Sequence, residues 1–468
     1  MYRYFRYIIQ GMFMLLSAIV SCKGQSEIPS LQELVDSAIH RDYTLANQQL
    51  DVQLTALDQS KLKDVYLPRL DLTVKDAFLL SSFGVKSKDL INIPQLNIDI
   101  KSGSNRFTTT GNLLTADLGA SMVLYSGGKV PQLKKALTYK SAAQEWMMES
   151  LRQQITSNVI QAYDQLALLK QVRIVLDQSE KRLEENRRTA DKALGYGLIT
   201  KYEHQKIEVA QAQLAARIQE YRGKQELVID QLAMFTHIDK DRLRKIEHEM
   251  QLITVSPGDG QIARRAELKA LDAKLQAGLY KINAEKTWFV PKVKAGASFG
   301  YLGLLAGHIS SSKALLPGVI NNKLSASLPD INILPMFNVG VGLKWDLFDG
   351  YEGQHEIKAA QIEYKKTENE KRDATEKLEL NLAKCRSDYQ IARDQVVLKS
   401  TEQQTAQNAL TQATKEYRTG LIKPLQLIDA ENDYLQSALG YVQAIYDQRR
   451  AAIALLMATG DLTVQAIP

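Results

Sequence analysis

Four short segments of the chain alternate apolar with polar or small residues, a pattern of period two that predicts β-strands with one apolar face. The alternation is clearest between Asn338 and Leu347, where apolar residues occupy every second position. It predicts strands at about 69–79, 116–125, 292–302 and 337–348, with long loops at about 80–115 and 303–336. Each predicted strand therefore has one apolar face and one face of polar or small residues.

Two long stretches contain neither glycine nor proline and predict very long helices. Residues 132–194 and 354–419 are uninterrupted runs of 63 and 66 residues, and each would be about 100 Å long at the α-helical rise. In the first run, apolar residues recur at steps of three and four from Met148 to Leu176, which indicates a coiled-coil seam. A glycine-containing turn and another helix follow each run, so helical hairpins are expected at about 129–236 and 352–459.

One offset of 223 residues relates the two halves of the chain, which predicts two tandem structural repeats. Each repeat has the order helix, strand, strand, long helix and helix. The first is expected to cover residues 22–256 and the second residues 257–468, with the joint in the stretch Ser256–Gly260. The landmarks that recur at this offset are Pro68 and Pro291, Gly127 and Gly350, Gly197 and Gly420, and Thr236 and Thr459.

The first 21 residues have the pattern of an export signal. Arg3 and Arg6 precede the mostly apolar run Tyr7–Val20, which is too short for a membrane-spanning helix of about 20 residues. The next residues resemble a bacterial lipobox, in which Cys22 would become the lipidated first residue of the mature chain. Alternatively, an ordinary signal is cleaved a few residues later, and Cys22 is discarded. No later segment has about 18 uninterrupted apolar residues, so no transmembrane helix is expected after the signal.

Composition and charge exclude several classes of function. Apolar residues make up 45% and charged residues 24% of the chain, which argues against a disordered chain and against a helical membrane protein with many spans. The net charge of +6 comes from 59 basic and 53 acidic residues, and gives no argument for nucleic-acid binding. Cys22 and Cys385 are far apart, and no two of the six histidines have ligand spacing, so no metal and no cofactor are expected. No catalytic motif stands in a suitable context, so the chain is not expected to be an enzyme.

The predicted strands allow two interpretations. In a soluble protein, a half-buried sheet would pack its apolar face on a helix layer, but the predicted helices are too long to fold back over so small a sheet. A lipid-facing barrel requires this out-and-in alternation in strands of about 9–11 residues. Because an open sheet edge leaves backbone groups unpaired in lipid, four strands would have to be completed by other copies of the chain. The expected fold class is therefore mainly α with a membrane β-barrel portion.

The order, duplication and spacing of several short motifs are those of a known family. They are the opening helix Leu31–Ala38, the Leu67-Pro68 step, the turns at Tyr125–Gly128 and Phe348–Gly350, and the helix-turn tips Gly197-Leu198 and Gly420-Leu421. In these features, residues 28–460 resemble the TolC family of outer-membrane efflux ducts. The resemblance implies a homotrimer in which three chains of four strands form a 12-stranded barrel in the outer membrane lipid. It also implies that the paired helices continue as a coiled-coil tunnel of about 100 Å in the periplasm.

The function implied by the resemblance is that of a passive exit duct in a tripartite efflux or secretion system. An inner-membrane pump would supply the energy, and a periplasmic adaptor (membrane fusion) protein would join the pump to the duct. An alternative from another class is a periplasmic coiled-coil scaffold or adaptor, which would share the long hairpins and the exported state. Adaptors normally carry one hairpin, whereas this sequence predicts two equivalent ones, so the duct is favoured.

The two helix-turn tips are where ducts of this family meet the adaptor. Glycine permits a positive φ in a tight reversal, so the turn alone explains one glycine in each tip. The Leu-Ile pair that follows each glycine is harder to explain as turn sequence, and the tips are therefore the candidate docking sites. They comprise Gly197, Leu198, Ile199 and Thr200 in the first repeat and Gly420, Leu421, Ile422 and Lys423 in the second.

Ducts of this family are often closed at the tip end by acidic residues near the threefold axis, which implies a periplasmic gate here. Matching the second tip by Gly420 places Asp429 at one such position, while Gln426 stands where another acid is common. Glu203 is the equivalent of Gln426 in the first repeat. A ring of three carboxylates would favour cations and repel its own members, which suits a gate. Alternatively, Asp429 is a solvated charge on a helix surface.

Overall fold

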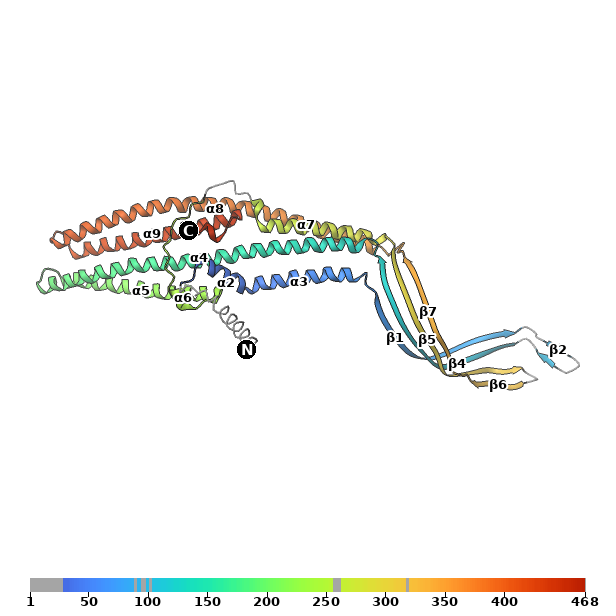
Figure 1. The fold of residues 1–468 in the computed structure, drawn as a ribbon. Helices are drawn as coiled ribbons and strands as arrows, with labels where there is room; N and C mark the ends of the chain where they lie inside the picture. The colour runs from blue at the N-terminus through green and yellow to red at the C-terminus, as the bar shows by residue number, and fades with distance from the viewer. Residues whose placement is uncertain are drawn as a thin grey trace, which may run out of the picture. The chain divides into compact units, whose positions relative to one another are not determined.

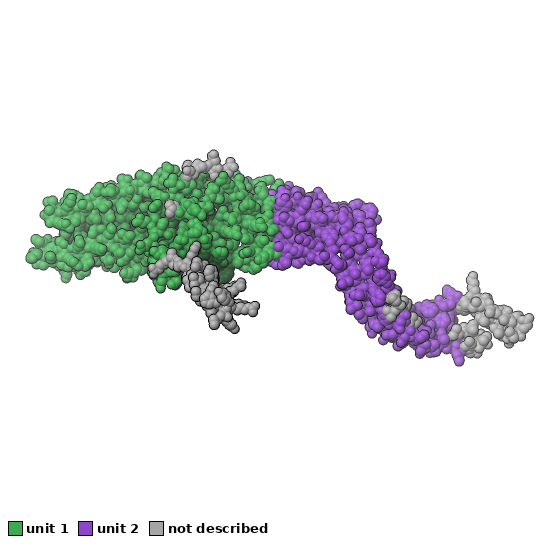
Figure 2. Space-filling view, viewed as in Figure 1, with its two compact units in different colours: residues 1–53, 141–274, 367–468 green, residues 54–140, 275–366 purple. Residues whose placement is uncertain are grey.

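The computed structural model describes residues 28–87, 91–93, 98–100, 103–255, 262–316 and 320–467. The predicted export signal, the lipidation candidate Cys22 and the predicted repeat joint at residues 256–260 lie outside the described residues. The chain divides into two compact units (Figure 2), of which unit 1 comprises residues 1–53, 141–274 and 367–468, and unit 2 residues 54–140 and 275–366.

Two long helical hairpins supply most of unit 1. The first pairs α4 (Lys129–Gly195) with α5 (Lys201–Thr236), and the second pairs α8 (Glu352–Arg418) with α9 (Pro424–Thr459) (Figure 1). α4 and α8 contain 67 residues each. The other helices of the described residues are α2 (Leu31–Arg41), α3 (Tyr43–Asp64), α6 (Lys240–Arg244) and α7 (Ala266–Glu285), with 3-10 turns η2 (Ile262–Arg264), η3 (Lys286–Phe289) and η4 (Val464–Ala466).

The core of unit 1 follows the seam that the step of three and four residues predicts on α4. Every apolar position of that step pattern belongs to one hydrophobic cluster, in which α4 packs against α2 and α5. Leu166 of α4 and Leu232 of α5 are completely buried in this cluster, as is Leu34 of α2. Burying one such side chain is worth about 1.5–3 kcal/mol. The predicted coiled-coil seam is confirmed.

A buried ion pair joins the two hairpins within unit 1. The guanidinium of Arg449 on α9 donates two hydrogen bonds of 2.9 Å to the carboxylate of Asp164 on α4. It also donates to the backbone oxygen of Gln251, which lies in the segment between α6 and η2. The neighbouring Gln448 holds the same segment, because its side-chain amide both donates to and accepts from the backbone of Ile253. Adjacent residues on α9 therefore fix both the first hairpin and the connecting segment.

Unit 2 is built around an antiparallel sheet. Its long strands are β1 (Arg69–Ser87), β4 (Gly103–Tyr125), β5 (Lys292–Leu316) and β7 (Ile331–Lys344), which pair in the order β1-β4-β5-β7. β6 (Ile320–Ser327) pairs with the part of β5 beyond β7. The short strands β2 (Ile91–Ile93) and β3 (Ile98–Ile100) form a separate two-stranded ladder.

The strands extend further than the alternation pattern predicts, and the prediction of long loops at about 80–115 and 303–336 is wrong. β1 continues to Ser87 and β4 begins at Gly103, because the ladder between them runs on through pairs such as Ser81 with Thr109. β5 likewise continues to Leu316. Serine and threonine pair well across strands but carry no apolar alternation, so the pattern stops before the hydrogen bonding does. At the other end, β7 stops at Lys344, whereas the alternation predicts a strand to residue 348.

Candidate functional site

The register of the sheet places the apolar residues of its four long strands on one face. Residues opposite each other in a ladder share a face, so the row Leu72, Leu118, Phe299 and Phe337 is continuous across β1, β4, β5 and β7. The residues next to these in the sequence point to the opposite face, and they are Asp71, Gly119, Ser298 and Asn338. Large side chains on the apolar face stay exposed, with Leu72 at 70% and Val339 at 74%.

The two outer strands of this sheet each have an open edge. Among the described residues, β1 pairs only with β4, and β7 pairs only with β5. An open edge presents unpaired backbone N–H and C=O groups, and such an edge pairs readily with another chain. An exposed apolar face that ends in two open edges is therefore an unfinished sheet.

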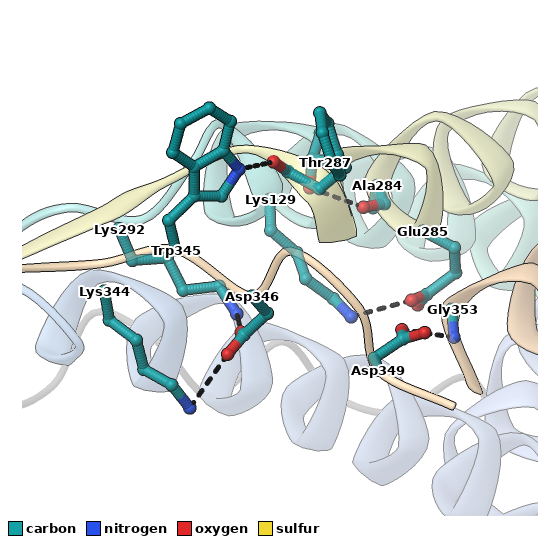
Figure 3. Close-up of polar contacts among 11 residues, drawn as sticks. Lys129, Ala284, Glu285, Thr287, Lys292, Lys344, Trp345, Asp346, Asp349 and Gly353 are labelled. Carbon is teal, nitrogen blue, oxygen red and sulfur yellow. Dashed lines mark hydrogen bonds and ion pairs between the residues drawn. The ribbon is translucent and has the colours of Figure 1, made fainter. Parts of the chain in front are cut away.

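Polar contacts fix the helix-side end of the strands (Figure 3). The indole N–H of Trp345 donates to the carbonyl of Phe289 at 2.9 Å, and Lys129 at the start of α4 forms a 2.7 Å ion pair with Glu285 at the end of α7. The carboxylate of Asp349 accepts from the backbone N–H of Gly353 in the first turn of α8 at 2.7 Å. These contacts hold the chain reversals that connect strands to long helices.

Gly127 and Gly350, two of the repeat landmarks, lie in these reversals. Both have φ near +70°, which disfavours any residue with a Cβ. At Gly127, an added Cβ would also lie only 3.0 Å from the backbone oxygen of Val290. On the polar face beside the reversals, Asp346 forms ion pairs with Lys292 at 3.6 Å and with Lys344 at 3.3 Å.

The two hairpin tips have the same local geometry and lie at the same end of unit 1 (Figure 1). Gly197 and Gly420 adopt φ of 70° and 73°, and the next residue in each tip donates from its backbone N–H to a carbonyl five residues earlier. This is the Schellman arrangement, which satisfies the last carbonyls of α4 and α8. It leaves Leu198 and Leu421 each 77% exposed. Ile199 and Ile422 turn inward and pack on the cores of their own hairpins.

The predicted gate residues Glu203 and Gln426 both cap the helix that follows their tip. The carboxylate of Glu203 accepts from the backbone N–H of Thr200 at 2.8 Å and from its hydroxyl at 2.9 Å, while the Thr200 hydroxyl accepts from the N–H of Glu203. The side-chain oxygen of Gln426 accepts from the N–H of Lys423 at 3.0 Å. The spacing Thr-x-x-Glu is a capping-box signal, so the sequence alone could have predicted the role of Glu203.

These two caps lead to a pH-dependent difference between the tips. Hydrogen bonds from the backbone and side chain of Thr200 lower the pKa of Glu203 below its ordinary value of 4.5, and Lys423 contributes. A carboxylate with a lowered pKa stabilises the folded state above its unfolded pKa, and this contribution disappears as the pH falls through the lowered value. We therefore expect the first tip to loosen below about pH 4.5, whereas the second tip, capped by the neutral Gln426, does not.

Hydrogen exchange followed by mass spectrometry measures this difference on peptides that contain Thr200 and Lys423 in the same sample. The ratio of their protection factors should fall on acidification in the wild-type protein and stay constant in Glu203→Gln. A constant ratio in the wild-type protein would contradict the capping role of the ionised carboxylate.

Asp429, the third predicted gate residue, differs from Glu203 and Gln426 in its contacts. Asp429 is exposed on α9 and makes no hydrogen bond or ion pair with the described residues, so it is available to a partner or an ion.

Two residues after Asp429, Glu431 is buried and accepts two hydrogen bonds of 2.9 and 3.0 Å from Arg182 on α4. Burial raises the pKa of Glu431, although Arg182 opposes the shift. This second bridge between the hairpins has no signal in the sequence, because its partners are 249 residues apart.

Over the described ranges, no helix is long and apolar enough to cross a membrane. Within that same part of the chain, no group of three or more His, Cys, Asp or Glu side chains could hold a metal ion.

In part of its sequence and in its fold, the chain is similar to outer membrane proteins. Residues 260–461 match the family described as outer membrane efflux protein.

Among solved structures, the Campylobacter jejuni CmeC outer membrane channel is 17% identical with a TM-score of 0.67, and the match covers 92% of this chain and 85% of that chain. The outer membrane protein VceC from Vibrio cholerae is 19% identical with a TM-score of 0.67, covering 92% and 96%. The open state of the Neisseria gonorrhoeae MtrE outer membrane channel is 14% identical with a TM-score of 0.66, covering 95% of each chain. No curated protein matches the sequence significantly.

These matches confirm the resemblance and the fold class that the sequence predicts. The long helices and the curled antiparallel sheet are the fold of outer membrane channels. The family that matches consists of efflux channels rather than enzymes.

Proposed function

We propose that this chain, of which residues 260–461 match the outer membrane efflux protein family, is a homotrimeric exit duct of a tripartite efflux or secretion system. Three copies would form a 12-stranded barrel in the outer membrane, and their hairpins would form a tunnel in the periplasm. The duct would conduct substrates passively, because energy comes from an inner-membrane pump. A periplasmic adaptor would couple that pump to the duct.

The observation that carries this proposal is the unfinished sheet of unit 2. Its exposed apolar face suits lipid, and its opposite face of glycine, serine, asparagine and charged residues suits a water-filled lumen. An open edge cannot stay unpaired in hydrocarbon, since each unsatisfied backbone group costs several kcal/mol. Antiparallel pairing of β7 with β1 of the next copy removes both edges at once. A periplasmic scaffold would leave the apolar face in water.

The hairpin tips are the proposed adaptor contacts. Leu198 and Leu421 stand exposed beside backbone turns whose own hydrogen bonds are complete, so these side chains are not needed for the turns. Asp429, near the second tip and without a hydrogen-bond or ion-pair partner among the described residues, is the proposed gate residue. Cys22 is the proposed lipidation site. Gln426 and Glu203 are proposed to act at the gate only by fixing the helix ends that carry it.

Changing the tip leucines should separate adaptor coupling from conduction. We expect the double variant Leu198→Asp/Leu421→Asp to lose most substrate export by cells that carry the cognate pump and adaptor. Its single-channel conductance in planar bilayers should equal that of the wild-type protein. Leu227→Asp, at an exposed leucine far along α5 from the tip, is the matched control and should export normally. Normal export by the double variant would contradict docking through these leucines.

Conductance measures the proposed function itself. Protein purified from outer membranes should form discrete, long-lived channels in planar bilayers, and no nucleotide or other energy source should be needed. An absence of channels from correctly folded protein would contradict the duct.

A further inference from the structure

On the helix-side part of the sheet, the apolar face has aliphatic rows between two levels that contain aromatic residues. The middle row consists of Leu70, Ala120, Ala297 and Val339, and the next row towards the helices contains Met122, Ala295 and Val341. Tyr125, Phe289 and Trp345 lie at the helix-side end, and each is about half exposed. On the other side of the middle row, Phe299 and Phe337 lie opposite each other in a row that continues through Leu118 and Leu72. The two groups of aromatic residues therefore mark two levels on the apolar face, with aliphatic residues between them.

The helix-side aromatic level combines exposed rings with satisfied polar groups. Trp345 directly follows β7 in the apolar series of alternate residues, and its ring meets that of Phe289 edge to face at 5.7 Å. Its indole N–H is bonded to the carbonyl of Phe289, so only apolar ring surface remains exposed (Figure 3). Aromatic rings of this kind are favoured at the boundary between hydrocarbon and lipid headgroups.

At the far end, the separation between the two faces breaks down. Asp76 and Asn112 lie on the same face as Leu72 and Leu118, because each is an even number of residues away on its own strand. A carboxylate on a lipid-facing surface is costly within the hydrocarbon. The uninterrupted apolar surface on β1 therefore ends before Asp76.

The long strands also bend along their length (Figure 1). The ladder between β4 and β5 shifts register between Thr110 and Asn112, and Ala306 opposite this shift adopts φ of 52°. A bulge of this kind bends a strand and increases its twist. The parts of β1, β4 and β5 past the bend pair through residues such as Ser82 and Thr108.

We propose that only the helix-side part of the long strands contacts phospholipid, between a girdle of Tyr125, Phe289 and Trp345 and a second girdle of Phe299 and Phe337. The strand segments beyond Asp76 then lie outside the hydrocarbon layer. From Trp345 to Phe337 is about 26 Å along the strand, or about 20 Å of depth at the usual barrel tilt, close to the apolar band of about 25 Å in such barrels. This inference rests on the proposed function, because it assumes that the apolar face meets a bilayer.

Quenching of tryptophan fluorescence by brominated phosphatidylcholine tests the depth of each position. Leu72 and Leu80 are a matched pair, since both are exposed leucines of β1 on the same face, on either side of Asp76. Each is replaced by tryptophan in the background W146F/W288F/W345F and reconstituted in vesicles with bromines near the headgroup or deep in the acyl chain. A third protein, W146F/W288F, keeps only the native Trp345 and leaves every strand residue unchanged.

Leu72→Trp should be quenched several-fold more strongly than Leu80→Trp, and Trp345 should respond most to the shallow bromines. Trp146, kept alone in W288F/W345F, is the control, because it lies on α4 under the ammonium of Lys269 and should not be quenched. Equal quenching of Leu72→Trp and Leu80→Trp, or stronger quenching of Trp345 by deep bromines, would overturn the inference. If the same vesicles still conduct in that case, the lipid-contact inference fails but the proposed function as a duct stands. If no strand position is quenched and no conductance is seen, the proposed function fails as well.

Discussion

The variant Val339→Lys is expected to abolish assembly of the proposed trimer. Val339 lies in the middle row of the apolar face and is 74% exposed. A lysine on the lipid face of a barrel costs up to about 2–4 kcal/mol, so three copies in the proposed trimer would cost up to about 6–12 kcal/mol. We expect the trimer band in outer-membrane extracts to disappear and the protein to be degraded.

The adjacent residue provides the control for this prediction. Asn338 lies on the polar face of the same strand, opposite Ser298 of β5, so Asn338→Lys places the same charge one residue away towards the proposed lumen. Asn338→Lys should assemble normally. If both variants assemble equally, or if Asn338→Lys is the more damaging, the assignment of the two faces is wrong.

Replacing Arg449 by methionine should strongly destabilise unit 1. Arg449 is completely buried and Asp164 nearly so, and methionine would leave the carboxylate without its two hydrogen bonds. Removing one partner of a buried ion pair typically costs about 3–5 kcal/mol. Guanidinium unfolding followed by helical circular dichroism should show a lower midpoint for Arg449→Met than for the wild-type protein.

The pH dependence of this destabilisation has a defined sign. Burial raises the pKa of Asp164 even with Arg449 present, and the loss of Arg449 removes the main opposing influence. An acid whose pKa is raised on folding loses stability as the pH rises through its folded pKa. The stability deficit of Arg449→Met should therefore be larger at pH 8 than at pH 5.

A double variant distinguishes the charge from the packing. Arg449→Met/Asp164→Leu replaces both partners by apolar groups and should recover most of the lost stability, because well-packed apolar pairs often replace buried ion pairs without loss. A double variant as unstable as Arg449→Met would show that the hydrogen bond from Arg449 to Gln251, rather than the ion pair, holds the connecting segment.

Local patterns predicted the parts of the fold that depend on neighbouring residues. The alternation around Val339 assigns each strand residue to a face, because the period of a strand is two. The steps from Met148 to Leu176 likewise identify the buried seam of α4, all of which lies in one core cluster. The strand segments beyond about residue 80 escaped prediction, since pairs such as Ser82 with Thr108 extend a ladder without any apolar signal.

The candidate site was predictable only where it depends on local chemistry. Gly197 and Gly420 were expected in tight turns, and both have positive φ. The bridges from Arg449 to Asp164 and from Arg182 to Glu431 escaped prediction, because their partners are 285 and 249 residues apart and belong to different hairpins. A single sequence gives no signal for such pairings.

The mass and membrane location of the full-length protein test the central claim most directly. Outer-membrane fractions should yield, in detergent, a particle of three chains, each somewhat lighter than the 52.5 kDa precursor after removal of the signal. A soluble periplasmic monomer or dimer would contradict the barrel, and the four strands would then be a small sheet on a coiled-coil scaffold.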